Sequence, residues 1–137
     1  MLDATDKRIL DELSKNSRIT MKELGEKVHL TGAAVSARVE KLEDNGVIEG
    51  YTIKVNQTKL GCSIYAFLTI IIQSPFHQPY LSFINNQGKY ILNNYKISGD
   101  GCYLLECRFP SSEMLDQFLL DLNKYANYKL SIVINKY

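Results

Sequence analysis

Few residues of this 137-residue chain have the type and spacing needed for catalysis or metal binding. The three cysteines (Cys62, Cys102 and Cys107) include no C-x-x-C pair, and the only histidines are His29 and His77. A zinc site needs about four nitrogen, sulfur or oxygen ligands, and a nucleophilic enzyme needs a base beside its nucleophile. We therefore expect no catalytic residue, no metal and no cofactor, and we predict that the cysteines act as small apolar side chains.

A different chemistry, contact with DNA, is indicated by residues 31–42. Val35, Val39 and Leu42 recur at the spacing of one helix face, which predicts a buried stripe. The opposite side of this helix has mostly small residues towards its N-terminal end, and small side chains let a helix backbone approach base edges in the major groove. The residues on that side are Ala33, Ser36, Ala37, Glu40 and Lys41.

Contacts with the DNA backbone are expected around the same helix. Ser36 and Lys41 supply polar groups, and Arg38 flanks the buried stripe within reach of a phosphate. Thr31 and Gly32 lie at the predicted helix N-terminus, where free backbone amides attract phosphate oxygens. The alternative is a plain three-helix bundle, in which the alanines only favour helix and Arg38 is a solvated surface charge.

Three short helices must position these residues. Apolar spacing and capping residues predict helices over 3–16, 20–28 and 31–44, and the short break before the third is typical of a helix-turn-helix. Residues 1–60 hold ten Lys or Arg and ten Asp or Glu, so their net charge is zero. One copy would neutralise few phosphates, and we expect DNA binding to need several copies acting together.

The rest of the chain predicts a second architecture. Residues 47–55 are β-branched and aromatic, which predicts a strand, and residues 56–59 are a polar linker. Further strands are predicted over 62–73, 90–97, 103–109 and 128–135, with one helix after the first and one after the third. The order βαββαβ is that of a ferredoxin-like domain. The predicted fold class is α+β, with a helix-turn-helix (winged-helix-like) domain over 1–52, a linker/strand over 53–60 and a ferredoxin-like domain over 61–137.

Two features of the C-terminal part concern partners and ligands. The predicted strand 62–73 is apolar on both faces, although helices cover only one face of such a sheet. Because soluble monomers rarely leave so large an apolar area exposed, we expect a second copy to cover the other face, the alternative being the N-terminal domain. The turn Gly99-Asp100-Gly101 favours a tight hairpin, and its free backbone is also able to cradle a small polar ligand.

Composition and charge exclude several classes of protein. The net charge is +1, with 45% hydrophobic and 23% charged residues, as in ordinary globular proteins. The longest apolar run, around residues 64–72, is far shorter than the ~20 residues of a membrane-spanning helix. The first residues carry acids rather than the bases of a signal peptide, so we expect a cytoplasmic protein.

Motifs along the whole chain match one known family. The first two helices fit through Leu2-Asp3-x-x-Asp6-x-x-Ile9-Leu10 and Arg18-Ile19-Thr20-x-x-Glu23-Leu24. The most specific stretch is Val35-x-x-Arg38-Val39-x-x-Leu42-Glu43-x-x-Gly46-Val47-Ile48-x-Gly50-Tyr51. Leu60-Gly61 and Ile97-Ser98-Gly99-x-x-x-Tyr103-Leu104-Leu105 fit the second domain. On these motifs the chain resembles the Lrp/AsnC (feast/famine) family of prokaryotic transcription regulators.

The resemblance implies a regulator that binds double-stranded DNA and bends or wraps it as a homodimer assembling to a higher oligomer, often an octamer. It also implies that residues 48–55 pair with their counterpart across the dimer, and that an amino acid binds between subunits near the Gly-Asp turn. The DNA-contacting residues expected are Arg18, Thr20, Lys22, Thr31, Gly32, Ala33, Ser36, Ala37, Arg38 and Lys41. The effector-contacting residues expected are Gly99, Asp100, Gly101, Cys102 and Tyr103.

The effector motif departs from the family pattern at one position. Cys102 stands where the family usually has an acidic residue before the tyrosine. A carboxylate accepts hydrogen bonds from a ligand ammonium group, whereas a thiol does so poorly, and Asp100 is the nearby substitute. The zero net charge of residues 1–60 favours an alternative function, an amino-acid-sensing oligomer whose helical domain docks proteins rather than DNA.

Overall fold

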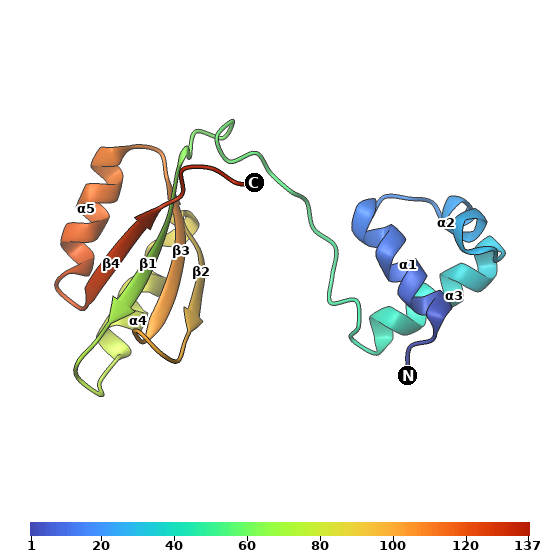
Figure 1. Cartoon of the computed structure of the whole chain (residues 1–137), viewed down its shortest axis with the longest axis horizontal. Helices are drawn as coiled ribbons and strands as arrows, with labels where there is room; N and C mark the ends of the chain where they lie inside the picture. The colour runs from blue at the N-terminus through green and yellow to red at the C-terminus, as the bar shows by residue number, and fades with distance from the viewer. The chain divides into compact units, whose positions relative to one another are not determined.

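The computed structural model describes residues 1–137, which divide into two compact units, Met1–Lys54 and Val55–Tyr137. Figure 1 shows the helices and strands of the two units. Each unit has a hydrophobic core of its own. No helix combines the length and the apolar composition that crossing a membrane requires.

The N-terminal unit consists of three helices: α1 (Ala4–Lys15), α2 (Met21–Val28) and α3 (Gly32–Asp44). The helices predicted from apolar spacing and capping residues are confirmed. Each N-cap residue accepts a hydrogen bond from the third residue of its helix through its side chain: Asp3, Thr20 and Thr31. The buried residues fall on the predicted faces, and they form one core: Ile9, Leu13, Ile19, Leu24, Val28, Val35, Val39 and Leu42.

The strand predicted over 47–55, and with it the strand part of the 53–60 linker, is wrong for the single chain. Most of these residues have no regular structure, and their larger apolar side chains are exposed, with Ile53 at 79% and Tyr51 at 52%. Only Ile48 packs against the helical core. A β-strand forms hydrogen bonds with a neighbouring strand, and the helical unit offers none, so β-forming residues alone do not make one.

The C-terminal unit is a four-stranded antiparallel sheet with two helices and one short 3-10 turn. Its elements are β1 (Ile64–Ile71), α4 (Gln78–Asn85), η1 (Gly88–Tyr90), β2 (Ile91–Lys96), β3 (Tyr103–Phe109), α5 (Ser112–Leu122) and β4 (Asn127–Ile132). The sheet order is β2-β3-β1-β4, which confirms the predicted ferredoxin-like βαββαβ arrangement. The observed strands lie within one residue of the predicted ranges or inside them.

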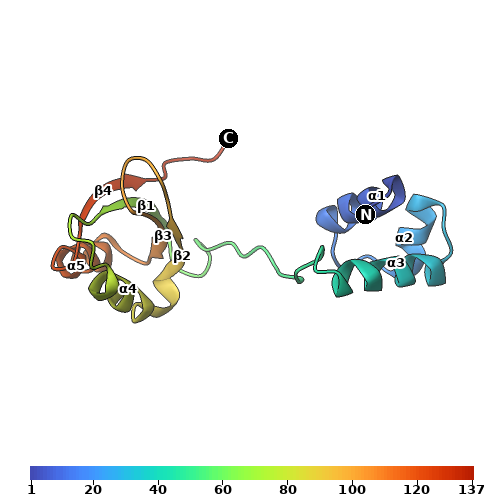
Figure 2. The same cartoon turned by 90° about the horizontal axis from the view of Figure 1, so that it is seen from below.

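Both helices of this unit cover the same face of the sheet (Figure 2). Burial alternates strictly along β3 and almost strictly along β1, as the two-residue period of a strand requires. The side chains of Ala66, Leu68 and Leu105 point towards α4 and α5 and are fully buried. The other face has no covering helix, so the same strands present a second set of side chains on it.

All three cysteines are free. Cys107 is fully buried in the sheet core, where its thiol contacts the backbone oxygen of Ala66 at 3.5 Å. Burial raises the pKa of the Cys107 thiol to about 12. Cys62 and Cys102 are half-buried.

Candidate nucleic-acid interface

The candidate DNA-reading surface is the outer face of α3, formed by Ala33, Ser36, Ala37, Glu40 and Lys41. All five residues are exposed, while the opposite stripe of Val35, Val39 and Leu42 is buried. The helix therefore separates an apolar inner side from an outer side of small and polar groups. At the N-terminal end of the outer face no side chain extends beyond a methyl group or a hydroxyl, which leaves the helix backbone open to close approach by a ligand.

The turn between α2 and α3 brings two further candidate residues beside the start of α3. A Cβ atom added at Gly32 would lie 3.6 Å from Lys22 Cα, so the backbones of the two helices are in near contact there. Thr31 caps α3 by accepting a hydrogen bond from the Ala34 amide at 3.1 Å. The exposed Lys22 side chain thus projects into solvent next to the positive end of the α3 dipole. The lysine charge and the helix dipole both attract an anion.

This close approach depends on an unusually tight turn. His29 ends α2 in the left-handed conformation, with φ of 62°, and the Leu30 amide donates to the Gly25 carbonyl at 2.9 Å. A Cβ atom on Gly25 would lie only 2.4 Å from the Leu30 carbonyl oxygen. Glycine at position 25 therefore allows the chain to fold back directly onto α2.

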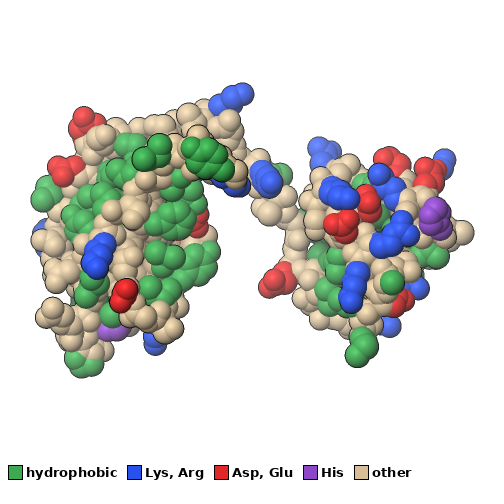
Figure 3. Space-filling model, in the orientation of Figure 1, with side chains coloured by type: hydrophobic (Ala, Val, Ile, Leu, Met, Phe, Trp, Pro, Cys, Tyr) green, Lys and Arg blue, Asp and Glu red, His purple; other side chains and the backbone are tan.

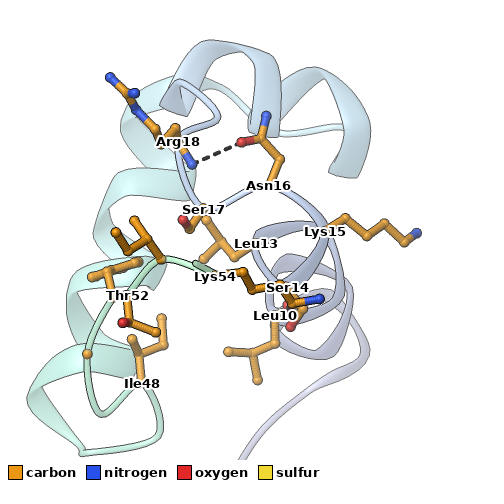
Figure 4. A pocket seen from close by; sticks show the side chains of 13 residues that line it. Leu10, Leu13, Ser14, Lys15, Asn16, Ser17, Arg18, Ile48, Thr52 and Lys54 are labelled. Carbon is orange, nitrogen blue, oxygen red and sulfur yellow. Dashed lines mark hydrogen bonds between the residues drawn. The ribbon is translucent and has the colours of Figure 1, made fainter. Parts of the chain in front are cut away.

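Arg18 and Thr20 lie at the other end of α2. The Thr20 hydroxyl accepts from the Glu23 amide and donates to the Glu23 carboxylate, both at 3.1 Å, so it is occupied as a helix cap. The Arg18 amide donates to Asn16 Oδ1 at 3.1 Å, and its guanidinium extends outward (Figure 4). Below Arg18, a groove runs between the end of α1 and residues 48–54, and Leu10, Leu13 and Ile48 point into it.

The basic residues of the unit differ in whether acidic side chains already pair with them. Lys15 pairs with Asp11 at 3.1 Å, and Lys27 pairs with Glu12 at 3.6 Å. By contrast, three of the expected DNA-contacting residues form no ion pair: Arg18, Lys22 and Lys41. Their charges are available to an external anion.

Arg38 behaves differently from these three. Its Nη1 atom donates to both carboxylate oxygens of Asp3, at 3.0 and 2.7 Å, and to Asp6 Oδ1 at 3.1 Å. These contacts raise the pKa of Arg38, and the hydrogen bond from Arg38 lowers the pKa of Asp3. Asp3 thus has two roles, as the N-cap of α1 and as a partner of Arg38, which lies 35 residues away in the sequence.

The five expected effector residues do not form one common surface. Tyr103 is buried in the core, with its hydroxyl 3.1 Å from His77 Nδ1. Asp100 is exposed at the tip of the turn, whereas Gly101 is folded against β1, where an added Cβ would lie 2.6 Å from the Thr69 side chain. Cys102 is also held against β1, because its amide donates to the Ile70 carbonyl at 2.7 Å. Positive φ angles at Gly99 and Gly101 are consistent with a tight turn.

The uncovered sheet face combines apolar side chains with one polar cluster. Tyr65, Phe67, Ile71 and Leu104 lie on it, and the C-terminal unit presents a broad apolar area in Figure 3. Glu106 lies on the same face, paired in register with Phe67 of β1. The Glu106 carboxylate accepts from the Tyr65 hydroxyl and from Asn93 Nδ2, the latter at 2.7 Å, and the Arg108 guanidinium stacks 4.1 Å from the Tyr65 ring centre.

Comparisons with known proteins agree with this architecture. Residues 2–49 match the family model described as winged helix-turn-helix DNA-binding. The transcriptional regulator LrpA of Bacillus subtilis is 69% identical over 136 residues, covering 99% of this chain and all of LrpA. The solved structure of B. subtilis LrpC superposes with a TM-score of 0.92 at 31% identity, covering 100% of this chain and 97% of that one.

A further solved structure resembles this chain and contains a ligand. It is the feast or famine regulatory protein of M. tuberculosis complexed with L-methionine. It is 26% identical, has a TM-score of 0.90, and the alignment covers 100% of this chain and 95% of that protein.

Proposed function

This chain belongs to the Lrp/AsnC family of helix-turn-helix transcriptional regulators, and from that premise we propose that it binds and bends double-stranded DNA as an assembly of identical subunits in the cytoplasm. The observation that carries the proposal is the outer face of α3, with its small residues, its unpaired Lys41 and the unpaired Lys22 beside its N-terminal end. In this proposal α3 enters the major groove, and Ser36, Ala37 and Ala33 lie nearest the base edges.

The backbone contacts follow from the residues that are free to make them. We assign phosphate contacts to Arg18, Lys22 and Lys41, together with the Thr31 and Gly32 end of α3. Thr20 remains a candidate through its exposed position, although its hydroxyl already caps α2. Three or four phosphate contacts give weak binding at physiological salt, so affinity must come from several copies on one DNA molecule.

Assembly is supported by two apolar surfaces that the single chain leaves exposed. One is the uncovered sheet face around Phe67, and the other is the segment 47–55, whose β-forming residues lack a partner strand. We propose that copies pair through both surfaces to form dimers and then higher oligomers such as octamers. DNA held by several recognition helices would be bent, and flexible or curved sequences would be favoured.

We further propose that an amino acid modulates this regulator at the Gly99–Tyr103 turn. The support is the L-methionine complex of the M. tuberculosis relative, together with the position of the turn at the end of the hairpin. Asp100 is the carboxylate available for a ligand ammonium group, since Cys102 supplies only a thiol. Calorimetry with each of the twenty amino acids tests this, and a lost response in Asp100→Asn would support the assignment. No heat with any amino acid would contradict it.

The DNA-binding proposal is tested by measuring affinity for curved promoter DNA over a range of salt concentrations. We expect affinity to fall steeply with salt, and Lys22→Ala and Lys41→Ala each to reduce the slope by about one phosphate contact. Lys96→Ala is the matched control, because Lys96 is an exposed lysine of β2 in the other unit. The absence of binding at low salt, or an equal loss of slope in the control, would refute the proposal and favour a protein-docking role.

A further inference from the structure

The strongest feature outside the assigned contacts is the cluster of Arg38, Asp3 and Asp6, which joins α3 to the beginning of α1. Asp3 and Asp6 already form a reciprocal capping box: the Asp6 amide donates to Asp3 Oδ1 at 2.8 Å, and the Asp3 amide donates to Asp6 Oδ2 at 3.2 Å. The guanidinium of Arg38 adds three further hydrogen bonds to the same two carboxylates. One side chain therefore bridges the whole N-cap of α1.

The bridge reduces the electrostatic repulsion between the Asp3 and Asp6 carboxylates. Two carboxylates held together by a capping box repel each other, and the positive end of the α1 dipole offsets only part of that repulsion. Arg38 brings one positive charge to the pair from the middle of α3. The Asp6 side chain is only 16% exposed and that of Arg38 35%, so this ion pair is less screened than one at the open surface.

The same arrangement makes Arg38 a poor phosphate ligand. A DNA phosphate would meet a guanidinium whose charge two acidic groups already offset, and the excess negative charge of the cluster would oppose its approach. Lys41, three residues further along α3, forms no ion pair and is exposed. The two basic residues of α3 thus have different roles available to them.

We propose that Arg38 is a positioning residue, which locks the DNA-reading helix α3 onto the N-cap of α1 and makes no phosphate contact. The statement that Arg38 makes no phosphate contact rests on the proposed DNA-binding function, whereas the lock of α3 onto α1 does not. It predicts that residues at the start of the chain influence DNA affinity without touching DNA, because they set how firmly α3 is held. The sequence predicts Arg38 as a DNA contact, whereas the proposed Arg38 contacts only the N-cap of α1.

The test is a mutational cycle in the full chain. Arg38→Gln is made in the wild-type background and in the Asp3→Asn/Asp6→Asn background, where asparagine keeps the helix cap but removes both charges. We expect Arg38→Gln to lower the Tm of the N-terminal unit by several degrees in the wild-type background, where it leaves two facing carboxylates. In the double-asparagine background the same change should have a much smaller effect. Equal losses of Tm in the two backgrounds would refute the bridge.

The second readout is the salt dependence of DNA affinity, with Lys41→Gln as the matched variant on the same helix. We expect Arg38→Gln to weaken binding by a similar factor at every salt concentration and to leave the slope unchanged, whereas Lys41→Gln reduces the slope by about 1. A reduction of about 1 in Arg38→Gln would identify it as a phosphate contact and overturn the proposal. If the wild-type protein fails to bind DNA, the proposed function falls, while the Tm cycle still decides whether the bridge exists.

Discussion

The hydrogen bonds and the pKa of individual side chains in this protein depend on the neighbouring groups. The Tyr65 hydroxyl illustrates this on the uncovered sheet face, because it donates to Glu106 while its ring supports the Arg108 guanidinium. The hydrogen bond to Glu106 is the largest cause that raises the pKa of Tyr65, to about 12, and desolvation adds to it. The carboxylate thereby holds the phenol in its protonated form.

A dependence of stability on alkaline pH follows. Because the pKa of Tyr65 is higher in the folded chain than its ordinary value of 10.0, its contribution to stability is fully present below about pH 10 and is lost as pH rises through about 12. In urea unfolding measured across this pH range, the free energy of unfolding should fall less in Tyr65→Phe than in the wild-type protein. Glu106→Gln should lower the pKa of Tyr65, as followed by tyrosinate absorbance. An unchanged titration in Glu106→Gln would show that the carboxylate is not the cause.

Gly25 and Gly32 provide a matched pair at the α2–α3 turn. We expect Gly25→Ala to lower the free energy of unfolding by about 1–3 kcal/mol, because its Cβ would overlap the Leu30 carbonyl. Gly32→Ala places a Cβ at an ordinary contact distance in a helix, where alanine is favoured over glycine. It should be neutral or slightly stabilising in urea denaturation. Comparable losses for both variants would mean that the turn tolerates a side chain at position 25.

At the scale of whole elements, the sequence predicted structures that depend on local pattern and failed where a distant partner was needed. The stripe of Val35, Val39 and Leu42 and the cap at Thr31 are properties of one helix, and both are confirmed. The segment 47–55 has the composition of a strand, yet the helical unit contains no strand for it to join. The sequence also assigns Arg38 to DNA, and nothing in local spacing reveals that its guanidinium meets Asp3.

The segment 47–55 should become ordered in the assembly, and Ile53 is the most exposed large apolar residue within it. Ile53→Asp should shift the protein to smaller species in analytical ultracentrifugation, because each copy loses the burial of an isoleucine, worth about 1.5–3 kcal/mol. The helical part of the circular dichroism signal should stay unchanged. Lys59→Asp introduces the same side chain at an exposed polar site and should leave assembly intact; dissociation in both variants would point to charge alone.

At the scale of the whole molecule, the chain consists of two units with separate cores. The division into a helical part and a sheet part was predictable because the hydrophobic period changes from about four residues to two near residue 60. The bare sheet face was also predictable, from one strand that is apolar on both sides. The effector residues stay a prediction; the sequence does not reveal that Tyr103 is buried in the core, because that burial depends on distant packing.

Separate cores predict that damage to one unit leaves the other intact. Leu24 and Leu68 are both fully buried, one in each unit, and replacement of either by alanine should cost about 2–5 kcal/mol. Calorimetry should show one unfolding transition shifted by Leu24→Ala and a different one shifted by Leu68→Ala. A common shift of all transitions in both variants would show that the units unfold cooperatively.

The buried thiol of Cys107 also determines how this molecule can be labelled. Its pKa of about 12 keeps it protonated, and therefore unreactive towards maleimide dyes, at neutral pH. The half-buried Cys62 and Cys102 remain as attachment points. Cys62 lies two residues before β1, and Cys102 lies at the hairpin turn, so Cys102→Ser leaves a single dye position at the entrance to the sheet and Cys62→Ser leaves one beside the proposed effector turn. Fluorescence from the two positions would then report assembly and ligand binding separately.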